Sequence, residues 1–450
     1  MDNATFRTIS VLFRASRVTR HFMLLFLAVA AFGMPSVAHA QYETTLVEPV
    51  LPPDYNRDRN VSVSEKPREG YDPIGVRVRS FILYPYVGGG FGYTNNVYLS
   101  ETQGVDDGYF HIAPSISIQS DWSRHWLALS AGGNFRNYLE ETARDQSAWH
   151  VNGEGQLEIG GNLQIRTKAG FSKYYESPFS GEVEANVAAL SSYEELKAGI
   201  EARYAEDRYR AALGYDYTSY DFNSVRISDG NTFAQKDRNR DIHRFQAQAE
   251  YAVSPAMAAY VQFAYVQTQY DRPLLNGDPN RDSDTWTGLA GVSFDISATM
   301  RGAVGVGYSS RKYDGPAYDD VDGISAEAKI EYFPSDLTTL TLKLRRVIQD
   351  TTVPEANAYF DNRILFGIDH DLRTNLIASL TAEYAKEDYI GTPEDTDFFQ
   401  VGAGARYLIS SSLGLKIDST YSSRKRDVIN PVFDGSVHEF LTVLTIFAQR

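Results

Sequence analysis

Charged side chains of both signs recur at every second position in segments that are otherwise apolar. Lys343 and Arg345, for example, alternate with Leu342 and Leu344. Because successive side chains of a β-strand point to opposite faces, such a strand has one apolar face and one charged face. Charged groups on one face can pair with charges on neighbouring strands, or they can coat a water-filled space and hydrogen-bond a polar solute. The spacing therefore indicates binding through many weak polar contacts.

The same alternation assigns a set of charged residues to one enclosed face, the lumen of a closed barrel. Pairing of opposite charges across the wall and coating of a wet channel are both expected of this set. Because the two signs are mixed, the set predicts weak charge selectivity and no tuned filter for cations or anions. The candidate lumen-lining residues are Arg166, Lys168, Lys197, Glu201, Arg203, Glu327, Lys329, Lys343, Arg345, Asp361, Arg363, Lys416 and Asp418.

The residues offer little for catalysis. No histidine after position 40 belongs to a nucleophile elbow, a metal-binding motif or a phosphate-binding loop. Segment 280–284 is acidic in the manner of a calcium loop, but it lacks the glycine and the distal glutamate of an EF-hand, so a solvated loop is expected there. The sequence predicts no enzyme, no cofactor and no metal site.

The elements that must position the charged residues are short β-strands. Between positions 81 and 447 the chain contains about 18 segments of period-2 alternation, with about 16 as the alternative count. Their connections are alternately short, as at 160–161, and long, as at Glu176–Leu190 and Asp221–Arg240. A propeller blade has a similar period, but propellers do not alternate loop lengths in this way. The predicted fold class is all-β: a transmembrane, antiparallel, up-and-down β-barrel with its short turns in the periplasm and its long loops outside.

Tyrosine supports this orientation. The chain has 30 tyrosines, and many lie where a strand runs into a long loop. Amphipathic rings favour the boundary between lipid and water, so these residues predict an aromatic girdle at the outer interface. The predicted girdle residues are Tyr93, Tyr138, Tyr175, Tyr217, Tyr270, Tyr308, Tyr384 and Tyr421.

The N-terminus has the composition of a secretory signal. Basic residues precede an apolar run from Phe22 to Met34, and the small residues Ala38 and Ala40 fit a cleavage site. We expect residues 1–40 to be a signal peptide cleaved near Ala40. Residues 41–75 contain several prolines and little apolar periodicity, so they predict a flexible periplasmic arm. Residues 76–450 then form the barrel, in the outer membrane of a Gram-negative bacterium.

Charge and cysteine content restrict the partners. The net charge is −15 and cysteine is absent. Negative charge disfavours nucleic acid as a partner. An exported chain without disulfides must obtain its stability elsewhere, and a barrel does so by closing every strand edge. The expected partners are outer-membrane lipid, lipopolysaccharide and the machinery that inserts barrels.

Two segments resemble a known family. They are Val76–Pro85 with its continuation to Val97, and the turn Tyr332–Thr338. Both resemble the outer-membrane β-barrel porin family found in proteobacterial exopolysaccharide and capsule gene clusters. The resemblance implies a role in moving or anchoring surface polysaccharide across the outer membrane, together with periplasmic polysaccharide-export proteins. It supplies no catalytic residues.

Three hypotheses of function follow. The first is a channel whose polar lumen passes exopolysaccharide or capsular polysaccharide, as the resemblance implies. The second is a passive diffusion porin for small hydrophilic solutes, which predicts steady open conductance. The third is a non-conducting structural or adhesion barrel whose loops close the lumen. Glu176–Leu190 and Asp221–Arg240 are the loops predicted to constrict the pore.

Overall fold

The computed structural model describes residues 61–101, 104–177, 179, 188–226, 231–275, 277–296, 299–351, 356–427 and 435–450. Regular structure in these residues is almost entirely β-strand, with short 3-10 helices at Thr142–Arg144 (η3) and Lys236–Arg238 (η4). None of the described helices is long and apolar enough to cross a membrane. The predicted signal peptide, and the predicted arm up to residue 60, lie outside the described residues.

The main strands run back and forth along the chain. They have 12 to 16 residues, which exceeds the roughly 10 residues that a tilted strand needs to cross a bilayer. The strands are β2 (Phe81–Thr94), β3 (Asp107–Ser120), β4 (Trp126–Tyr138), β5 (Gln146–Ile159), β6 (Leu163–Tyr175), β7 (Ser192–Glu206), β8 (Tyr209–Phe222), β11 (Arg240–Ser254), β12 (Met257–Tyr270), β13 (Ser283–Ile296), β14 (Met300–Tyr313), β15 (Val321–Ser335), β16 (Thr338–Gln349), β17 (Ala358–Arg373), β18 (Leu376–Ile390), β19 (Asp395–Ser410), β20 (Leu413–Asp427) and β21 (Gly435–Gln449).

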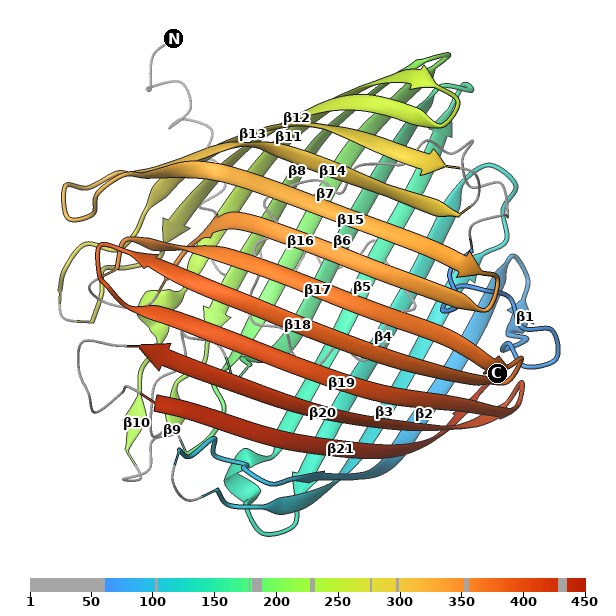
Figure 1. Ribbon diagram of the computed structural model, residues 1–450, viewed down its shortest axis with the longest axis horizontal. Coiled ribbons are helices and arrows are strands. Elements are labelled where there is room, and N and C mark those ends of the chain that lie inside the picture. The colour runs from blue at the N-terminus through green and yellow to red at the C-terminus, as the bar shows by residue number, and fades with distance from the viewer. Residues whose placement is uncertain are drawn as a thin grey trace.

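These strands close on themselves. Each pairs in antiparallel fashion with the strands before and after it, and β8 is followed in the sheet by β11. The sheet closes where β2 pairs with both β3 and β21. The result is an 18-strand antiparallel, up-and-down barrel (Figure 1), so the predicted fold class and the first of the two predicted counts are confirmed. Closure pairs the backbone groups that lipid could not satisfy.

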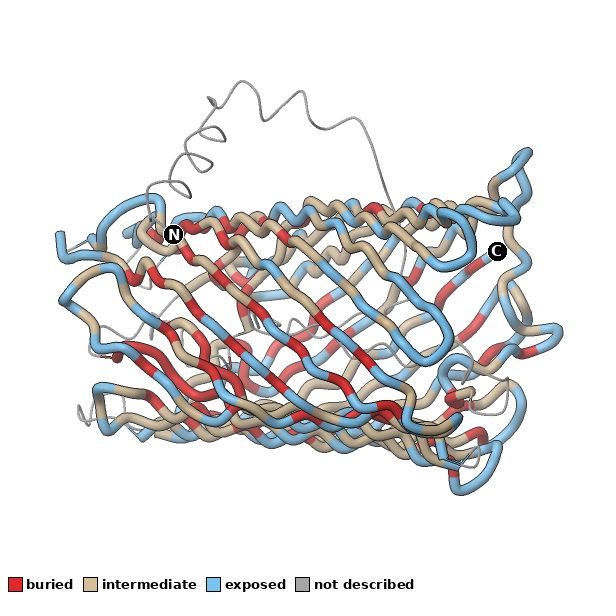
Figure 2. The backbone as a smooth tube through the Cα atoms, turned by 90° about the horizontal axis from the view of Figure 1, so that it is seen from above, coloured by how far each residue is buried: buried red, intermediate tan, exposed pale blue. Residues whose placement is uncertain are grey.

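The alternation places apolar side chains outside the barrel and polar side chains inside it. On β12, Val261 and Phe263 are 58% and 46% exposed, whereas Tyr260 and Gln262 are 4% and 3% exposed. Figure 2 shows buried and exposed positions alternating along the tilted strands. The outer band of exposed apolar residues is the surface that lipid covers in an outer-membrane barrel.

The two ends of the barrel differ. The C-terminus and a short strand, β1 (Val76–Val78), lie at one end, while the small hairpin of β9 (Val225–Arg226) and β10 (Thr232–Phe233) lies at the other (Figure 1). At the C-terminal end the connections are tight turns. Two of them place residues in the left-handed region, at Gly160 (φ 65°) and Asp207 (φ 49°). Positive φ is what two-residue hairpin turns require.

The N-terminal segment (residues 61–75) packs against the barrel wall. Val63 is 1% exposed and forms an apolar cluster with Ile377, Leu408 and Phe447. These partners belong to β18, β19 and β21, so the segment lies against the inner face of the wall at the end that holds the C-terminus. A flexible arm was predicted for residues 41–75, and its described part makes fixed contacts because Val63 is apolar and the inner wall offers it an apolar patch.

Candidate functional site

Every residue predicted to line the lumen points inward. Within each strand these residues occupy the positions between the exposed apolar ones. Lys343 and Arg345 flank Leu344, which is 39% exposed on the outer face, and Asp361 and Arg363 have the opposite parity to Ile364, which is 41% exposed. These residues therefore share the inner parity of their strands, and their role in lining a channel stays a prediction.

Ion pairs join many of these side chains along one half of the wall. Lys168 Nζ lies 2.6 Å from Asp216 Oδ1, and Lys197 Nζ lies 2.8 Å from Glu195 Oε2. Arg166 donates a hydrogen bond of 2.8 Å to Gln156. Further pairs are Arg203 with Glu201 and, elsewhere in the barrel, Lys416 with Asp418 at 2.9 Å. The lysines on β6 and β7 are exposed to the lumen, and each of them forms an ion pair with a carboxylate.

A denser network covers the wall from β14 to β18. Arg345 and Arg363 both pair with Asp361, whose side chain is fully buried, and Arg363 also pairs with Glu383. Arg301 pairs with Glu331 on the neighbouring strand. A buried carboxylate is tolerated only when cations and hydrogen bonds surround it. These arginines therefore stiffen the wall as well as lining the lumen.

At the end with the long loops, a described residue of the β6–β7 loop contacts the inner face of a distant strand. Phe179 in this loop is 8% exposed and packs against Phe398 of β19, with ring centroids 5.8 Å apart. β19 is not a neighbour of β6 in the sheet, and six strands separate the two on the shorter way round. Phe179 must therefore lie inside the barrel mouth.

The two loops predicted to constrict the pore contact each other. Glu176 receives two hydrogen bonds from the Arg238 guanidinium, at 2.9 and 2.5 Å. Burial alone would raise the pKa of Glu176, but the Arg238 charge outweighs burial and holds the pKa below its ordinary value. Arg238 in turn lies 4.1 Å above the Phe222 ring, and Ser191 and Gln235 are hydrogen-bonded at 2.7 Å. A contact to both β19 and the β8–β11 loop holds the β6–β7 loop in place.

Other long loops join this assembly. Asn280 donates a hydrogen bond of 2.6 Å to the Asp237 carbonyl, and Arg281 donates one of 3.1 Å to the Ala356 carbonyl. Asp350, just beyond β16, accepts a hydrogen bond from the Tyr270 hydroxyl of β12. The described residues of these loops are therefore linked to one another by hydrogen bonds at this mouth, and together they are called the loop layer.

At the opposite end, the N-terminal segment is held by buried charge. Arg68 forms an ion pair of 2.7 Å with Asp371, and their side chains are 7% and 3% exposed. Arg68 also donates a hydrogen bond of 2.8 Å to the Thr374 carbonyl. Val63 N donates to Thr339 Oγ1 at 2.9 Å, and Glu65 lies 3.2 Å from Arg301. The lumen is thus narrowed at both ends by the protein's own chain.

Six of the eight predicted girdle tyrosines lie on the outer face. Tyr93, Tyr308, Tyr384 and Tyr421 are 41% to 52% exposed there, and Tyr175 and Tyr217 share the outer parity of their strands. Tyr138 and Tyr270 point inward instead. Tyr138 packs against Tyr109 with the rings tilted by 45° and their centroids 5.0 Å apart, and the Tyr270 hydroxyl donates a hydrogen bond to Asp350. A position at the end of a strand does not determine whether a side chain points outward or inward. The odd or even position of the residue along the strand determines it.

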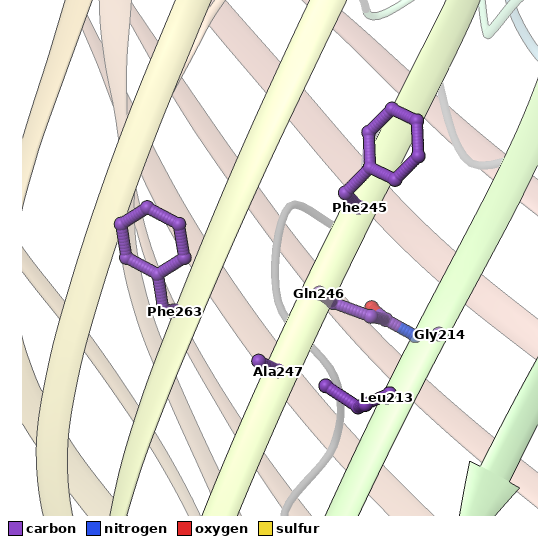
Figure 3. Close-up of a pocket in the computed structure, with 6 residues that line it drawn as sticks. All are labelled: Leu213, Gly214, Phe245, Gln246, Ala247 and Phe263. Carbon is purple, nitrogen blue, oxygen red and sulfur yellow. The ribbon is translucent and has the colours of Figure 1, made fainter. Parts of the chain in front are cut away.

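The depression in Figure 3 is not part of the lumen. Its apolar walls, Leu213, Phe245, Ala247 and Phe263, belong to the outer face of β8, β11 and β12. Gln246 has the opposite parity and extends from β11 over Gly214 of β8 (Figure 3), where an added Cβ would lie 2.6 Å from its Nε2. The depression therefore faces lipid and offers no site for a hydrophilic solute.

The sequence profile of one protein family matches residues 68–443, and this family is described as "Putative beta-barrel porin 2". The chain belongs to this family. The match begins at Arg68, inside the N-terminal segment, and covers nearly the whole barrel. Family and fold together place this porin-like channel in the outer membrane of a Gram-negative bacterium. None of the curated proteins matches the chain.

Several solved barrels have a similar fold at low sequence identity. OccK2 (OpdF) of Pseudomonas aeruginosa in complex with glucuronate is 10% identical, with a TM-score of 0.44 over 81% of this chain and 97% of that chain. OccAB4 of Acinetobacter baumannii is 10% identical, with a TM-score of 0.42 over 86% and 100%. A mutant of the ferric enterobactin receptor PfeA of P. aeruginosa is 8% identical, with a TM-score of 0.42 over 81% and 81%.

Sequence reasoning about this porin missed two features of the site. Arg68 and Val63 bind the N-terminal segment to the wall, although proline-rich composition predicted mobility. Their signal was an apolar residue and a basic residue in an otherwise weakly patterned stretch. Phe179 gave a similar signal, as a large apolar side chain in a loop predicted to constrict the pore.

Proposed function

We propose that this porin is a passive channel for small hydrophilic solutes, narrowed at its two mouths by the β6–β7 loop and by the N-terminal segment. The observation that carries the proposal is the combination of a charged lumen with the two contacts Phe179–Phe398 and Arg68–Asp371. Barrels of 16 to 18 strands are wide enough to hold an aqueous channel. A loop across such a lumen limits the size of what can pass.

Planar-bilayer conductance and liposome swelling test this proposal. The purified chain should give steady conductance without a partner. Monosaccharides should enter liposomes, and the rate should fall steeply from disaccharides to larger oligosaccharides because the loop limits the opening. Absence of both conductance and swelling would reject the channel and favour a structural or adhesion barrel.

Export of a surface polysaccharide is the second candidate. Its support is the resemblance of Val76–Pro85 and Tyr332–Thr338 to barrels from exopolysaccharide and capsule gene clusters, together with a lumen of mixed charges suited to many weak contacts. A polymer in transit would require the β6–β7 loop and the N-terminal segment to move aside. A clean deletion strain tests this function: polysaccharide lost from the surface and accumulated in the periplasm would support export, and unchanged polysaccharide would reject it.

The proposed function includes a route to the membrane and a set of partners. Residues 1–40 direct export and are removed near Ala40, and N-terminal sequencing of the mature chain tests this prediction. Outer-membrane lipid and lipopolysaccharide surround the wall, and the barrel-insertion machinery assembles it. Periplasmic polysaccharide-export proteins are partners only under the second candidate. We propose no enzymatic activity.

A further inference from the structure

Two lysines differ from the other lysines of the inner wall. Lys329 of β15 and Lys343 of β16 are both exposed to the lumen, and neither makes a hydrogen bond or ion pair with any residue that the structure describes. The other inward lysines, Lys168, Lys197 and Lys416, each have a carboxylate oxygen within 2.9 Å. The wall thus neutralises its lysines except at one place.

The carboxylates near this place already have cationic partners. Glu331 pairs with Arg301, and Asp361 and Glu383 pair with Arg363. Glu327 lies directly opposite Arg345 in the sheet. Each of these carboxylates therefore lies next to an arginine, and neither ammonium group has a carboxylate oxygen of a described residue within ion-pair distance.

The register brings the two lysines together. Lys329 and Lys343 are directly opposite each other in the β15–β16 ladder. Opposed side chains in an antiparallel pair have Cβ atoms about 5 Å apart, and like charges in such pairs are destabilising. Two like charges that lower stability, face water and have no partner among the described residues are typical of a site that binds a ligand of opposite charge.

We propose that Lys329 and Lys343 form an anion-binding site in the lumen, which holds the carboxylate of a small hydrophilic solute as it passes. The inference rests on the proposed channel and gives it a substrate class. Two ammonium groups supply several donors without a fixed fork, so they can hold a carboxylate that arrives in different orientations. The site lies between the two narrowed mouths, where a solute is already partly dehydrated and attraction is least screened.

Galacturonate and galactose are suitable probes because galacturonate has a carboxylate where galactose has an uncharged hydroxymethyl group, and the two sugars are otherwise the same. Liposome swelling with the wild-type chain should favour galacturonate at low salt, and the preference should weaken as ionic strength rises. The variant K329Q/K343Q should reduce the galacturonate-to-galactose ratio by roughly three- to tenfold and leave galactose entry unchanged. As a matched control, K173Q/K425Q removes two positive charges outside the lumen and should keep the wild-type ratio.

Thermal unfolding of the detergent-solubilised chain separates this site from the channel. Galacturonate should raise the melting temperature of wild type and leave that of K329Q/K343Q unchanged, because a ligand stabilises only the state that binds it. Inorganic phosphate, tested in parallel, shows whether phosphorylated solutes share the site. Without ligand, the K329Q/K343Q variant should melt at or above the melting temperature of wild type, since it loses a pair of like charges.

The outcomes are distinct. If galactose does not enter liposomes but galacturonate still shifts the melting temperature through the two lysines, the channel fails and the site stands. If K329Q/K343Q keeps the wild-type ratio and the ligand-induced shift, the site is rejected. A variant that melts lower than wild type with an unchanged ratio assigns the lysines a structural role and also rejects the proposal.

Discussion

Arg68 is the residue that ties the N-terminal segment most firmly to the wall. Its ion pair with Asp371 is almost completely buried, with side-chain exposures of 7% and 3%. Breaking such a pair costs about 3–5 kcal/mol when the remaining charge stays buried. In R68A the segment can instead detach and expose Asp371 to water. We therefore expect faster proteolysis within residues 61–75 and higher conductance, with little change in the melting temperature of the barrel.

Arg77 supplies the matched control for this prediction. It pairs with Asp121 near the same end of the barrel, but the two side chains are 61% and 47% exposed. Exposed pairs contribute at most about 1 kcal/mol. R77A should therefore leave both proteolysis and conductance at wild-type values. Equal behaviour of R68A and R77A would show that the buried pair does not hold the segment.

Asp282 predicts a pH dependence in the loop layer. Burial, and then the nearby charge of Asp314, raise the pKa of Asp282 to about 6. The unfolded chain has a lower pKa, near 4, so between about pH 6 and pH 4 the folded state binds more protons than the unfolded state. Stability of the loop layer should therefore rise as the pH falls through this window and be lowest above pH 6.

Hydrogen exchange of residues 271–282 measures this effect. Wild type should show stronger protection at pH 5 than at pH 7, after correction for the intrinsic exchange rate. D282N keeps the Oδ1 acceptor for the Tyr270 backbone N–H, which lies 2.7 Å away, and removes the charge. The variant should be protected at both pH values, and a pH dependence equal to that of wild type would assign the effect to another group.

Among the elements, the period-2 alternation of the sequence is sufficient to predict most of the architecture. Leu342, Lys343 and Leu344 already distinguish an outer from an inner face, and the structure places them accordingly. The pattern could not identify segments that fold back into the lumen. Such segments, around Val63 and Phe179, bury single apolar residues against a distant strand, and that contact leaves no periodic signal. Tyr138 and Tyr270 illustrate a related limit, since position at a strand end does not reveal which face a ring occupies.

The β6–β7 loop should act as an element that narrows the outer mouth. F179A removes the ring that packs on Phe398 and should free the loop from β19, because an alanine side chain cannot span the gap. We expect a higher single-channel conductance and entry of larger sugars into liposomes. Phe171, which packs on Trp149 within the wall at 5.2 Å, gives the control F171A, with unchanged conductance. An unchanged size limit in F179A would contradict the assignment.

At the scale of the whole molecule, the two narrow places lie in series along one path. The N-terminal segment lies at the end with the short turns, and Phe179 lies at the end with the long loops. They share no contact in the described residues, and the charged wall from β14 to β18 lies between them. Each is held by its own partners, so loss of one should leave the other in place.

Series geometry makes a quantitative prediction for the double variant R68A/F179A. Resistances along a single path add, so removing one barrier raises conductance only to the limit set by the other. The decreases in resistance of the two single variants should add in the double variant. The increase in conductance of the double variant over wild type should therefore exceed the sum of the increases of the two single variants. Single-channel recordings of the four proteins under one salt condition measure this. If either single variant already reached the conductance of the double variant, the other segment would not obstruct the path, and the channel would have one narrow place instead of two.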